Sequence, residues 1–475
     1  MATADAAQPP VLRATVNSFD LFDTLLVRRA LVPTRVFEDV ERATGARGYA
    51  QARQLAEQSL IARNIDYDLA AIYREMVRLG HCDDATAALL EQAEIEAEFD
   101  HALPITENLS RIGEHDIVVS DMYLPADILR RLLRHVGLQR HVHIVASNAG
   151  KHHGTIWSEL ERHWLIREHI GDNLHSDVTA PRARGIPATH YGNSQPSQIE
   201  RLLAQHGQIE LAGLVRGLRL SCPHADSSEE GQLWQFSVQL NLPLLCLMAG
   251  VVFHHARDRR LGPILFSARD CYQLADIFGI LHPTVAAEYV HVSRRALRED
   301  PAGVAEFLRS RGPAALVVDI ASTGHSWYCL AEAQGILVRL LALVRVDHHA
   351  YLHNVSQEQI NASRHLTFDS LLRNSEFPGY SNAIEVLNTA PHGSATRLQG
   401  GRRFAAPEFD DAAELPPAVV ATVDAAHRTA MALVRKSARR LREELPARPD
   451  PALLTSLLQT ITLNPQLREI GKVLL

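Results

Sequence analysis

The chain has 475 residues, 46% of them hydrophobic and 22% charged, and its formal net charge is -7. This length allows two or three domains with full hydrophobic cores, and the composition is that of a soluble globular protein. The acidic balance argues against a general nucleic-acid-binding protein, which is usually basic overall. The five cysteines have no paired spacing and the first ten residues have no export signal, so we expect a cytoplasmic protein in a reducing environment.

Short apolar runs alternate with helical patterns in the first 200 residues. Residues 14–28 predict a strand and a loop, and residues 33–102 carry apolar residues at i, i+3, i+4 and i+7, the pattern of helices. Beyond them, predicted strands alternate with predicted helices at 115–122, 126–137, 141–147, 155–166, 169–173 and 178–185. This alternation predicts an α/β fold with a parallel Rossmann-like sheet and a helical block inserted after the first strand.

The second half repeats the α/β pattern after a polar connection at 221–232, and the tail from about residue 414 is helical. We expect four parts: a first α/β domain over 1–200 with its helical insertion at 33–102, a helical linker over 201–260, a second α/β domain over 261–405, and a helical C-terminal extension over 406–475.

One apolar segment, residues 233–253, is nearly long enough to span a bilayer. Its polar residues Gln235, Gln239 and Asn241, together with Pro243, are costly in hydrocarbon. We therefore expect a buried helix or helix pair at a domain seam and no integral span, with peripheral membrane contact as the alternative.

Polar side chains follow the predicted strands of the first domain at the points where these strands end. They are Asp20, Ser120, Lys151 after the third strand, and the pair Asp172 and Asp177. Carboxyl ends of parallel strands meet at one edge of a sheet, so these groups are expected to converge. Carboxylates hold a hard cation, lysine and hydroxyl groups neutralise phosphate oxygens, and a carboxylate can attack phosphorus. The set favours magnesium-dependent phosphoryl transfer.

Four segments in order, FDLFDTLL, VVSD, the lysine of NAGKHHG and GDNLHSD, resemble the haloacid dehalogenase superfamily of hydrolases over residues 14–195. The resemblance implies that the helical block is a cap over the substrate. It also implies a role for each matching residue: Asp20 as nucleophile, Mg²⁺ bound by Asp20, Asp172 and the Phe22 carbonyl with Asp177 in support, Ser120 on phosphate, and Lys151 steadying the charge.

The first segment departs from the phosphatases of that superfamily, which usually carry a second aspartate where this chain has Phe22. The proton for the leaving group is then expected from Asp23, Asp121 or the substrate itself. Asp23 is otherwise a turn or helix N-cap residue. A dehalogenase and a metal-binding domain without activity are the alternatives. His152 and His153, beside Lys151, are expected to line the site; the 25 histidines show no metal-ligand spacing.

A second group of polar residues lies in the loop DIASTGHS after an apolar strand. Hydroxyls, a glycine and a helix N-terminus favour a phosphate cradle, although an ordinary N-cap turn uses the same residue types. The loop resembles the phosphoribosyl-pyrophosphate signature of type I phosphoribosyltransferases, except that Val318 replaces the first acid. The resemblance implies binding of the phosphorylated sugar by Asp319, Ser322, Thr323, Gly324, Ser326, Arg269 and Arg294, with Arg295 beside them.

Together the two halves predict a phosphatase fused to a phosphoribosyltransferase-like domain. Such a pair could transfer 5-phosphoribosyl to a glycan acceptor and then remove the 5-phosphate, leaving ribofuranose, as in polysaccharide biosynthesis. The alternatives are a sugar-phosphate or nucleotide phosphatase with a non-catalytic second domain, and a sensor or scaffold for phosphorylated ligands. His392, in a polar turn, is a possible site residue or a loop histidine.

Overall fold

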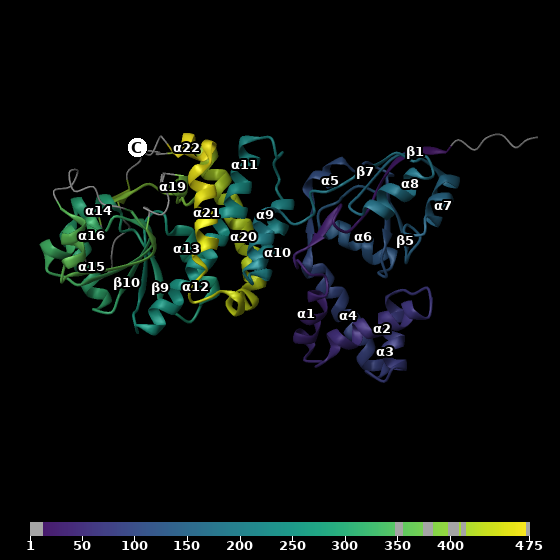
Figure 1. Ribbon diagram of the computed structural model, residues 1–475, viewed down its shortest axis with the longest axis horizontal. Helices are drawn as coiled ribbons and strands as arrows, with labels where there is room; N and C mark the ends of the chain where they lie inside the picture. The colour runs from purple at the N-terminus through teal and green to yellow at the C-terminus, as the bar shows by residue number, and fades with distance from the viewer. Residues whose placement is uncertain (1–12, 347–354, 374–382, 398–407, 410–414, 472–475) are drawn as a thin grey trace, which may run out of the picture. The chain divides into compact units, whose positions relative to one another are not determined.

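The structure is a computed structural model that describes residues 13–346, 355–373, 383–397, 408–409 and 415–471. The chain forms two compact units, one of Met1–Pro196 with Leu220–Pro223 and one of Ser197–Arg219 with His224–Leu475. Each unit contains a five-stranded parallel sheet (Figure 1). The predicted α/β class is therefore confirmed.

The sheet of the first unit has the strand order β5-β4-β1-β6-β7, and all neighbouring strands are parallel. The chain runs outward from β1 through β4 to β5 and then returns to the other side of β1 for β6 and β7. Loops leave in opposite directions at the β1/β6 boundary, which makes it a topological switch point. The strands are β1 (Ala14–Phe19), β4 (Ile117–Asp121), β5 (His143–Ser147), β6 (Trp164–Gly171) and β7 (Ala188–His190).

The helices of this sheet follow the expected alternation, with one correction. The helix predicted over 155–166 ends at His163, and Trp164 already belongs to β6. Parallel pairing with β1 over Ala14–Val16 buries Ile166 and extends the strand at the helix's expense. The helices are α5 (Thr106–Arg111), α6 (Ala126–His135), α7 (Thr155–His163), the π-helix η1 (Leu174–Thr179) and α8 (Ala180–Arg182).

The helical insertion leaves and rejoins the first unit through a two-stranded stem. Strands β2 (Leu26–Arg28) and β3 (Ala102–Pro104) pair antiparallel. Between them lie α1 (Arg35–Thr44), α2 (Tyr49–Ala62), α3 (Leu69–Arg78) and α4 (Asp84–His101).

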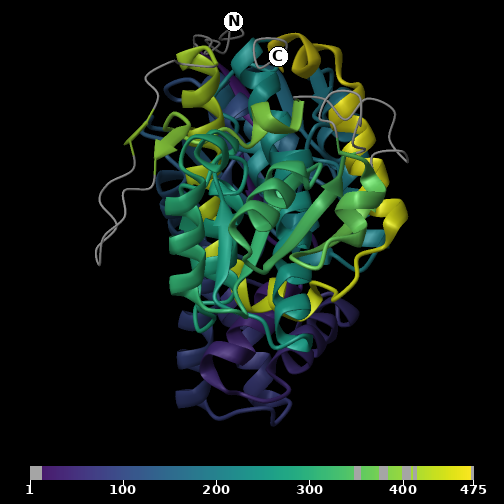
Figure 2. The same ribbon diagram turned by 90° about the vertical axis from the view of Figure 1, so that its left-hand side faces the viewer.

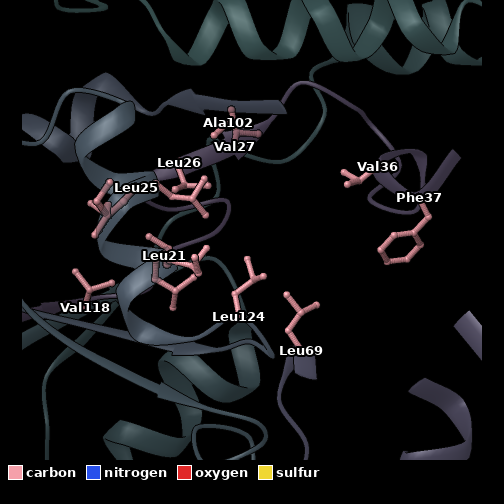
Figure 3. Close-up of a cluster of buried hydrophobic side chains, with 14 of the residues drawn as sticks. Leu21, Leu25, Leu26, Val27, Val36, Phe37, Leu69, Ala102, Val118 and Leu124 are labelled. Atoms are coloured by element: carbon pink, nitrogen blue, oxygen red, sulfur yellow. The ribbon is translucent and has the colours of Figure 1, made fainter. Parts of the chain in front are cut away.

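The insertion shares its hydrophobic core with the stem and the sheet. Figure 3 shows Leu21, Leu26 and Val118 near the sheet and Leu69 and Phe37 of the insertion in the same buried cluster. The insertion therefore packs on the loop that carries Asp20 onward from β1.

The second unit has the strand order β12-β11-β10-β8-β9, again with parallel neighbours. The chain moves from β8 to β9 on one side and from β10 through β11 to β12 on the other, so its switch point lies between β8 and β10. Figure 2 faces this sheet, drawn in green. The strands are β8 (Ile264–Ser267), β9 (Ala287–Val290), β10 (Leu316–Ser322), β11 (Val338–Arg345) and β12 (Leu366–Arg373).

Helices cover both faces of this sheet, with α14, α15 and α16 on one side and α12 and α13 on the other (Figure 1). They are α13 (Tyr272–Leu281), α14 (Arg294–Glu299), α15 (Pro301–Arg311), α16 (His325–Gln334), α18 (Gln357–Ala362) and α19 (Ala383–Leu387). Strands β13 (Ala395–Arg397) and β14 (Glu408–Phe409) form a separate antiparallel pair.

The segments expected as a helical linker and a C-terminal extension pack against each other within the second unit. Helix α20 (Pro417–Glu444) contacts α13 and α11 (Glu229–Phe236). Their apolar faces bury one another, so neither segment stands apart from the second sheet. The remaining helices are α9 (Gln198–Gln205), α10 (Ile209–Leu220), η2 (Ser237–Asn241), α12 (Leu242–Asp258), α21 (Pro451–Leu463) and α22 (Pro465–Gly471).

The apolar segment at 233–253 lies in the continuous helix Glu229–Asp258. This helix is long and apolar enough to cross a membrane, but 83% of its apolar window is buried inside the structure. The burial agrees with the expected core helix.

Candidate active sites

Asp20, Lys151 and Asp177 meet at the carboxyl edge of the first sheet. The backbone N–H of Asp20 donates to the Ile170 carbonyl at 2.8 Å, which fixes the end of β1 against β6. The Lys151 ammonium donates to Asp20 Oδ1 and, at 2.7 Å, to Asp177 Oδ1. All three side chains are buried. The structure thus brings together groups that lie far apart in the sequence, at the topological switch point.

Asp172 completes a group of three carboxylates. One oxygen from each of Asp20, Asp172 and Asp177 lies within 4.8 Å of the others. Hard oxygen donors of this kind suit Mg²⁺ better than nitrogen- or sulfur-preferring metals. The residues present therefore fit the cation that the sequence predicts.

Burial and crowding change the proton affinities of these carboxyl groups. Burial raises the pKa of Asp20 to about 7; Lys151 opposes this shift, and Asp177 and Asp172 add to it. Burial, then Asp23 and Asp177, raise the pKa of Asp172 to about 6. Burial also acts to raise the pKa of Asp177, but hydrogen bonding from His169 and the charge of Lys151 outweigh it and lower that pKa to about 2. Two of the three carboxylates therefore lack enough positive charge nearby, as expected for a site that binds a cation.

The raised pKa values of Asp20 and Asp172 allow cation binding to be tested by its dependence on pH. We expect the rise in melting temperature on adding Mg²⁺ to grow from about pH 5 to about pH 8, because protons compete with the cation on raised carboxyl groups. Without the cation, the folded state binds more protons than the unfolded state between the ordinary value of 3.8 and about 7, so the Asp20 contribution lowers stability as pH rises through this window. Thermal unfolding with and without Mg²⁺ measures this; an increment that does not change with pH would contradict it.

Two buried residues that the sequence analysis missed hold Asp177 in place. His169 Nε2 lies 3.2 Å from Asp177 Oδ1, and His169 Nδ1 lies 2.9 Å from the Ser18 hydroxyl. Because the carboxylate accepts from Nε2, Nδ1 is left to accept from Ser18. The available signal was a histidine within the apolar run that ends in Gly171-Asp172.

Gly171 leaves room for the Asp177 side chain, since a Cβ at this position would lie 2.4 Å from Asp177 Cγ. We expect Gly171→Ala to displace Asp177, to weaken Mg²⁺ binding at least about tenfold, and to destabilise the first unit by about 1–3 kcal/mol. Calorimetric Mg²⁺ titration and chemical denaturation measure the two effects. Gly185→Ala, at a position with open space around it, controls for substitution of a glycine in this unit, although its backbone strain costs some stability as well. Unchanged Mg²⁺ affinity in Gly171→Ala would contradict the account.

Through hydrogen bonds, Asp121 holds the loop that carries Lys151. Its carboxylate accepts hydrogen bonds from the Ser147 hydroxyl and from the backbone N–H groups of Lys151 and His152, the latter two at 3.0 Å. These contacts engage both carboxylate oxygens of Asp121, which the sequence offers as one of three proton sources. Ser120 is buried at the end of β4, on the strand next to β1, where the sequence places it.

Asp23 caps no helix, because residues 23–25 form a turn that leads into β2. Its φ of 57° lies in the left-handed region, and its backbone N–H donates to the Leu26 carbonyl at 2.7 Å. Its charge contributes to the raised pKa of Asp172, so it lies beside the carboxylate group. Phe22 packs under the Arg28 guanidinium, 4.1 Å from its ring centre. The role of Asp23 as a proton donor stays a prediction.

His152 and His153 follow Lys151 in its loop and are exposed. The ring of His152 also lies 4.8 Å from that of His175, and His175 Nε2 bonds to the His152 carbonyl at 3.1 Å. These histidines connect the Lys151 loop with the loop that follows Asp172.

The second sheet also places polar residues at its switch point. Asp319 lies in the middle of β10, Ser322 is its last residue, and Thr323 and Gly324 connect the strand to α16. Gly324 has a φ of 76°, and a Cβ there would lie 2.7 Å from the Phe368 ring. The Ser322 and Thr323 hydroxyls accept from backbone N–H groups two residues onward, both at 3.2 Å.

Two further acids that the sequence analysis did not single out lie at this edge. Burial, followed by Glu385 and Asp319, raises the pKa of Asp270 well above its usual range, while Arg269 and Arg294 oppose that shift. Burial raises the pKa of Asp319 to about 6, against the charge of Arg294. Three carboxyl groups and two guanidinium groups thus share one edge. Asp270 follows Arg269 directly, but a lone acid in a loop gives no signal of its own.

Three more residues that the sequence singles out lie on other elements of the second unit. Arg295 pairs with Glu299 at 2.7 Å on the exposed surface of α14. Ser326 lies in the first turn of α16. His392 Nε2 lies 2.9 Å from the Tyr289 hydroxyl, within a group of partly exposed rings.

Comparison with models of known protein families and with curated proteins finds no match for this chain.

Proposed function

We propose that the first unit is a magnesium-dependent phosphatase of the haloacid dehalogenase type. The observation that carries this proposal is the buried convergence of Lys151 with Asp20 and Asp177, next to Asp172. Phosphoryl transfer needs a nucleophilic carboxylate, a positive charge held beside it, here the Lys151 ammonium, and hard oxygen ligands for a metal ion.

In the proposed reaction an oxygen of Asp20 attacks phosphorus, and the bond from phosphorus to the leaving oxygen breaks. The leaving alcohol takes its proton from Asp23 or from the substrate itself. Water then hydrolyses the aspartyl phosphate, which releases phosphate and restores the carboxylate. Lys151 stabilises the negative charge on Asp20 and on the transferring group.

Binding and orientation fall to the residues around the nucleophile. The Ser120 hydroxyl donates to a phosphate oxygen. Asp20, Asp172 and the Phe22 carbonyl would hold Mg²⁺, with Asp177 in support. When bound, Mg²⁺ supplies charge neutralisation on the phosphate. The helical insertion excludes water from the substrate.

We infer further that the second unit is a phosphoribosyltransferase-like domain that acts on phosphoribosyl pyrophosphate. Strand β10 carries one acid, Asp319, since the position expected for a first acid holds Val318, which is fully buried. Asp270 and Glu385 bring carboxylates to Asp319 from other elements, next to Arg269 and Arg294. Their arrangement supports an edge that binds a cation and phosphate groups together. In this account the acceptor is a glycan, and the first unit removes the 5-phosphate after transfer.

The test separates the two units by variant. Consumption of phosphoribosyl pyrophosphate and release of phosphate from ribose 5-phosphate and other sugar phosphates are measured on the full chain. Asp319→Asn is expected to stop the first reaction and spare the second, and Asp20→Asn to do the reverse. Phosphate release without any consumption of phosphoribosyl pyrophosphate, with a glycan acceptor panel present, would leave a phosphatase with a binding module. Binding without turnover in either assay would favour a sensor.

A further inference from the structure

Three histidines gather at the amino-terminal edge of the first sheet, the edge opposite to Asp20. The His115 N–H donates to the His141 carbonyl at 2.8 Å, and the His143 N–H donates to the Asp116 carbonyl at 2.9 Å. These bonds continue the parallel pairing of β4 with β5, in which Ile117 lies opposite His143. His141 lies two residues before His143, the first residue of β5, and His115, with a φ of 65° in the turn before β4, lies opposite His141.

The ring contacts agree with this register. The ring centres lie 5.8 Å apart for His115 and His141, 6.1 Å for His115 and His143, and 5.8 Å for His141 and His143. Two imidazoles that bind one Zn²⁺ through nitrogens about 2 Å from it have ring centres on the order of 5–6 Å apart. The rings of His115 and His141 are exposed, so rotation about their side-chain bonds can direct one nitrogen of each toward a common point.

A carboxylate and a tryptophan lie beside the three histidines. Glu114 Oε2 accepts from the His141 N–H at 2.9 Å, so a carboxylate is held beside the histidines. Trp164 packs 5.4 Å from the His143 ring and restricts its movement.

We propose that His115, His141 and His143 form a binding site for one Zn²⁺ or a similar divalent transition metal ion, with water or Glu114 as the fourth ligand. Imidazole ligands select such metals over Mg²⁺, so this site and the carboxylate site are expected to take different ions. A bound ion would join the amino-terminal ends of β4 and β5 and stabilise the edge strand of the sheet.

The test uses the full chain without a histidine tag, in excess Mg²⁺ to fill the carboxylate site. Zn²⁺ titration against a chromophoric chelator, together with thermal unfolding, is run on wild type, His141→Gln and His143→Gln. We expect one equivalent of Zn²⁺ bound by wild type, at least about tenfold weaker binding in both variants, and a zinc-induced rise in melting temperature that both variants lose. His81→Gln, at an exposed histidine of the helical insertion, is the matched control and is expected to behave as wild type.

Two results would overturn the proposal. One is the absence of stoichiometric Zn²⁺ binding in wild type. The other is binding that His141→Gln and His143→Gln leave unchanged, which would place the ion at the carboxylates or at His152 and His175. Far-UV circular dichroism of each variant confirms that it is folded.

Discussion

Asp20→Asn is expected to lower magnesium-dependent phosphate release by at least about 10³-fold, because an amide oxygen does not form the covalent intermediate. The same change is expected to leave the protein folded, and to stabilise it slightly without Mg²⁺ above about pH 7. It removes a buried carboxyl group whose pKa burial raises to about 7, and it leaves Lys151 paired with Asp177. Initial rates on the best sugar phosphate, with thermal unfolding alongside, measure both effects.

Asp127→Asn is the matched control, since Asp127 is an exposed acid of the same unit at the start of α6. It is expected to keep the wild-type rate. An Asp20→Asn variant that retains a rate within about tenfold of wild type would remove Asp20 from the role of nucleophile.

The second large effect is expected in the helical insertion, where a buried ion pair joins α2 to α4. The Arg53 guanidinium bonds to both oxygens of Glu94 at 2.8 and 2.9 Å, and both side chains are fully buried. The Tyr49 and Tyr73 hydroxyls donate to the same carboxylate at 2.9 and 2.7 Å. Glu94→Leu is therefore expected to destabilise the insertion by about 3–5 kcal/mol, because it removes the buried acceptor of two hydroxyls and leaves the buried guanidinium with only the partly exposed Glu57.

Hydrogen exchange of residues 49–101 resolves this loss from the stability of the second unit. The double variant Arg53→Met/Glu94→Leu is expected to recover most of the loss, since no buried charge then remains. Glu161→Leu, which breaks the half-exposed pair with Arg184, is the control and is expected to cost no more than about 1 kcal/mol. A cost of that small size for Glu94→Leu would contradict the account.

The first site was largely predictable because its residues follow strands. Apolar runs mark β1, β4 and β6, and the parallel arrangement then brings the residues after them to one edge. Lys151 was harder to place, since it lies four residues beyond β5, in a loop whose shape depends on Asp121. That dependence is a tertiary contact between two strands, and no local pattern in the sequence records it.

Contacts between distant segments account for what the sequence did not reveal. In the sequence, His169 is one more residue of a predicted strand, and only the structure shows its contact with Asp177. Asp270 and Glu385 can be recognised as neighbours of Asp319 only in the folded chain, where the loop after β8, strand β10 and helix α19 lie close together. The histidine group shows no metal-ligand spacing in the sequence because His115 and His141 come from two distant segments, before β4 and before β5, that the pairing of these strands brings together.

The most direct test of the central claim, that Asp20 is the nucleophile, is to trap the phosphorylated enzyme. Wild type and Asp20→Asn are mixed with the best substrate in Mg²⁺ and quenched in acid during turnover, and the peptide containing residues 18–26 is examined by mass spectrometry. The account predicts a phosphoryl group on Asp20 in wild type and none on this peptide in the variant. Turnover with this peptide unmodified, or with the phosphoryl group on another residue, would contradict it.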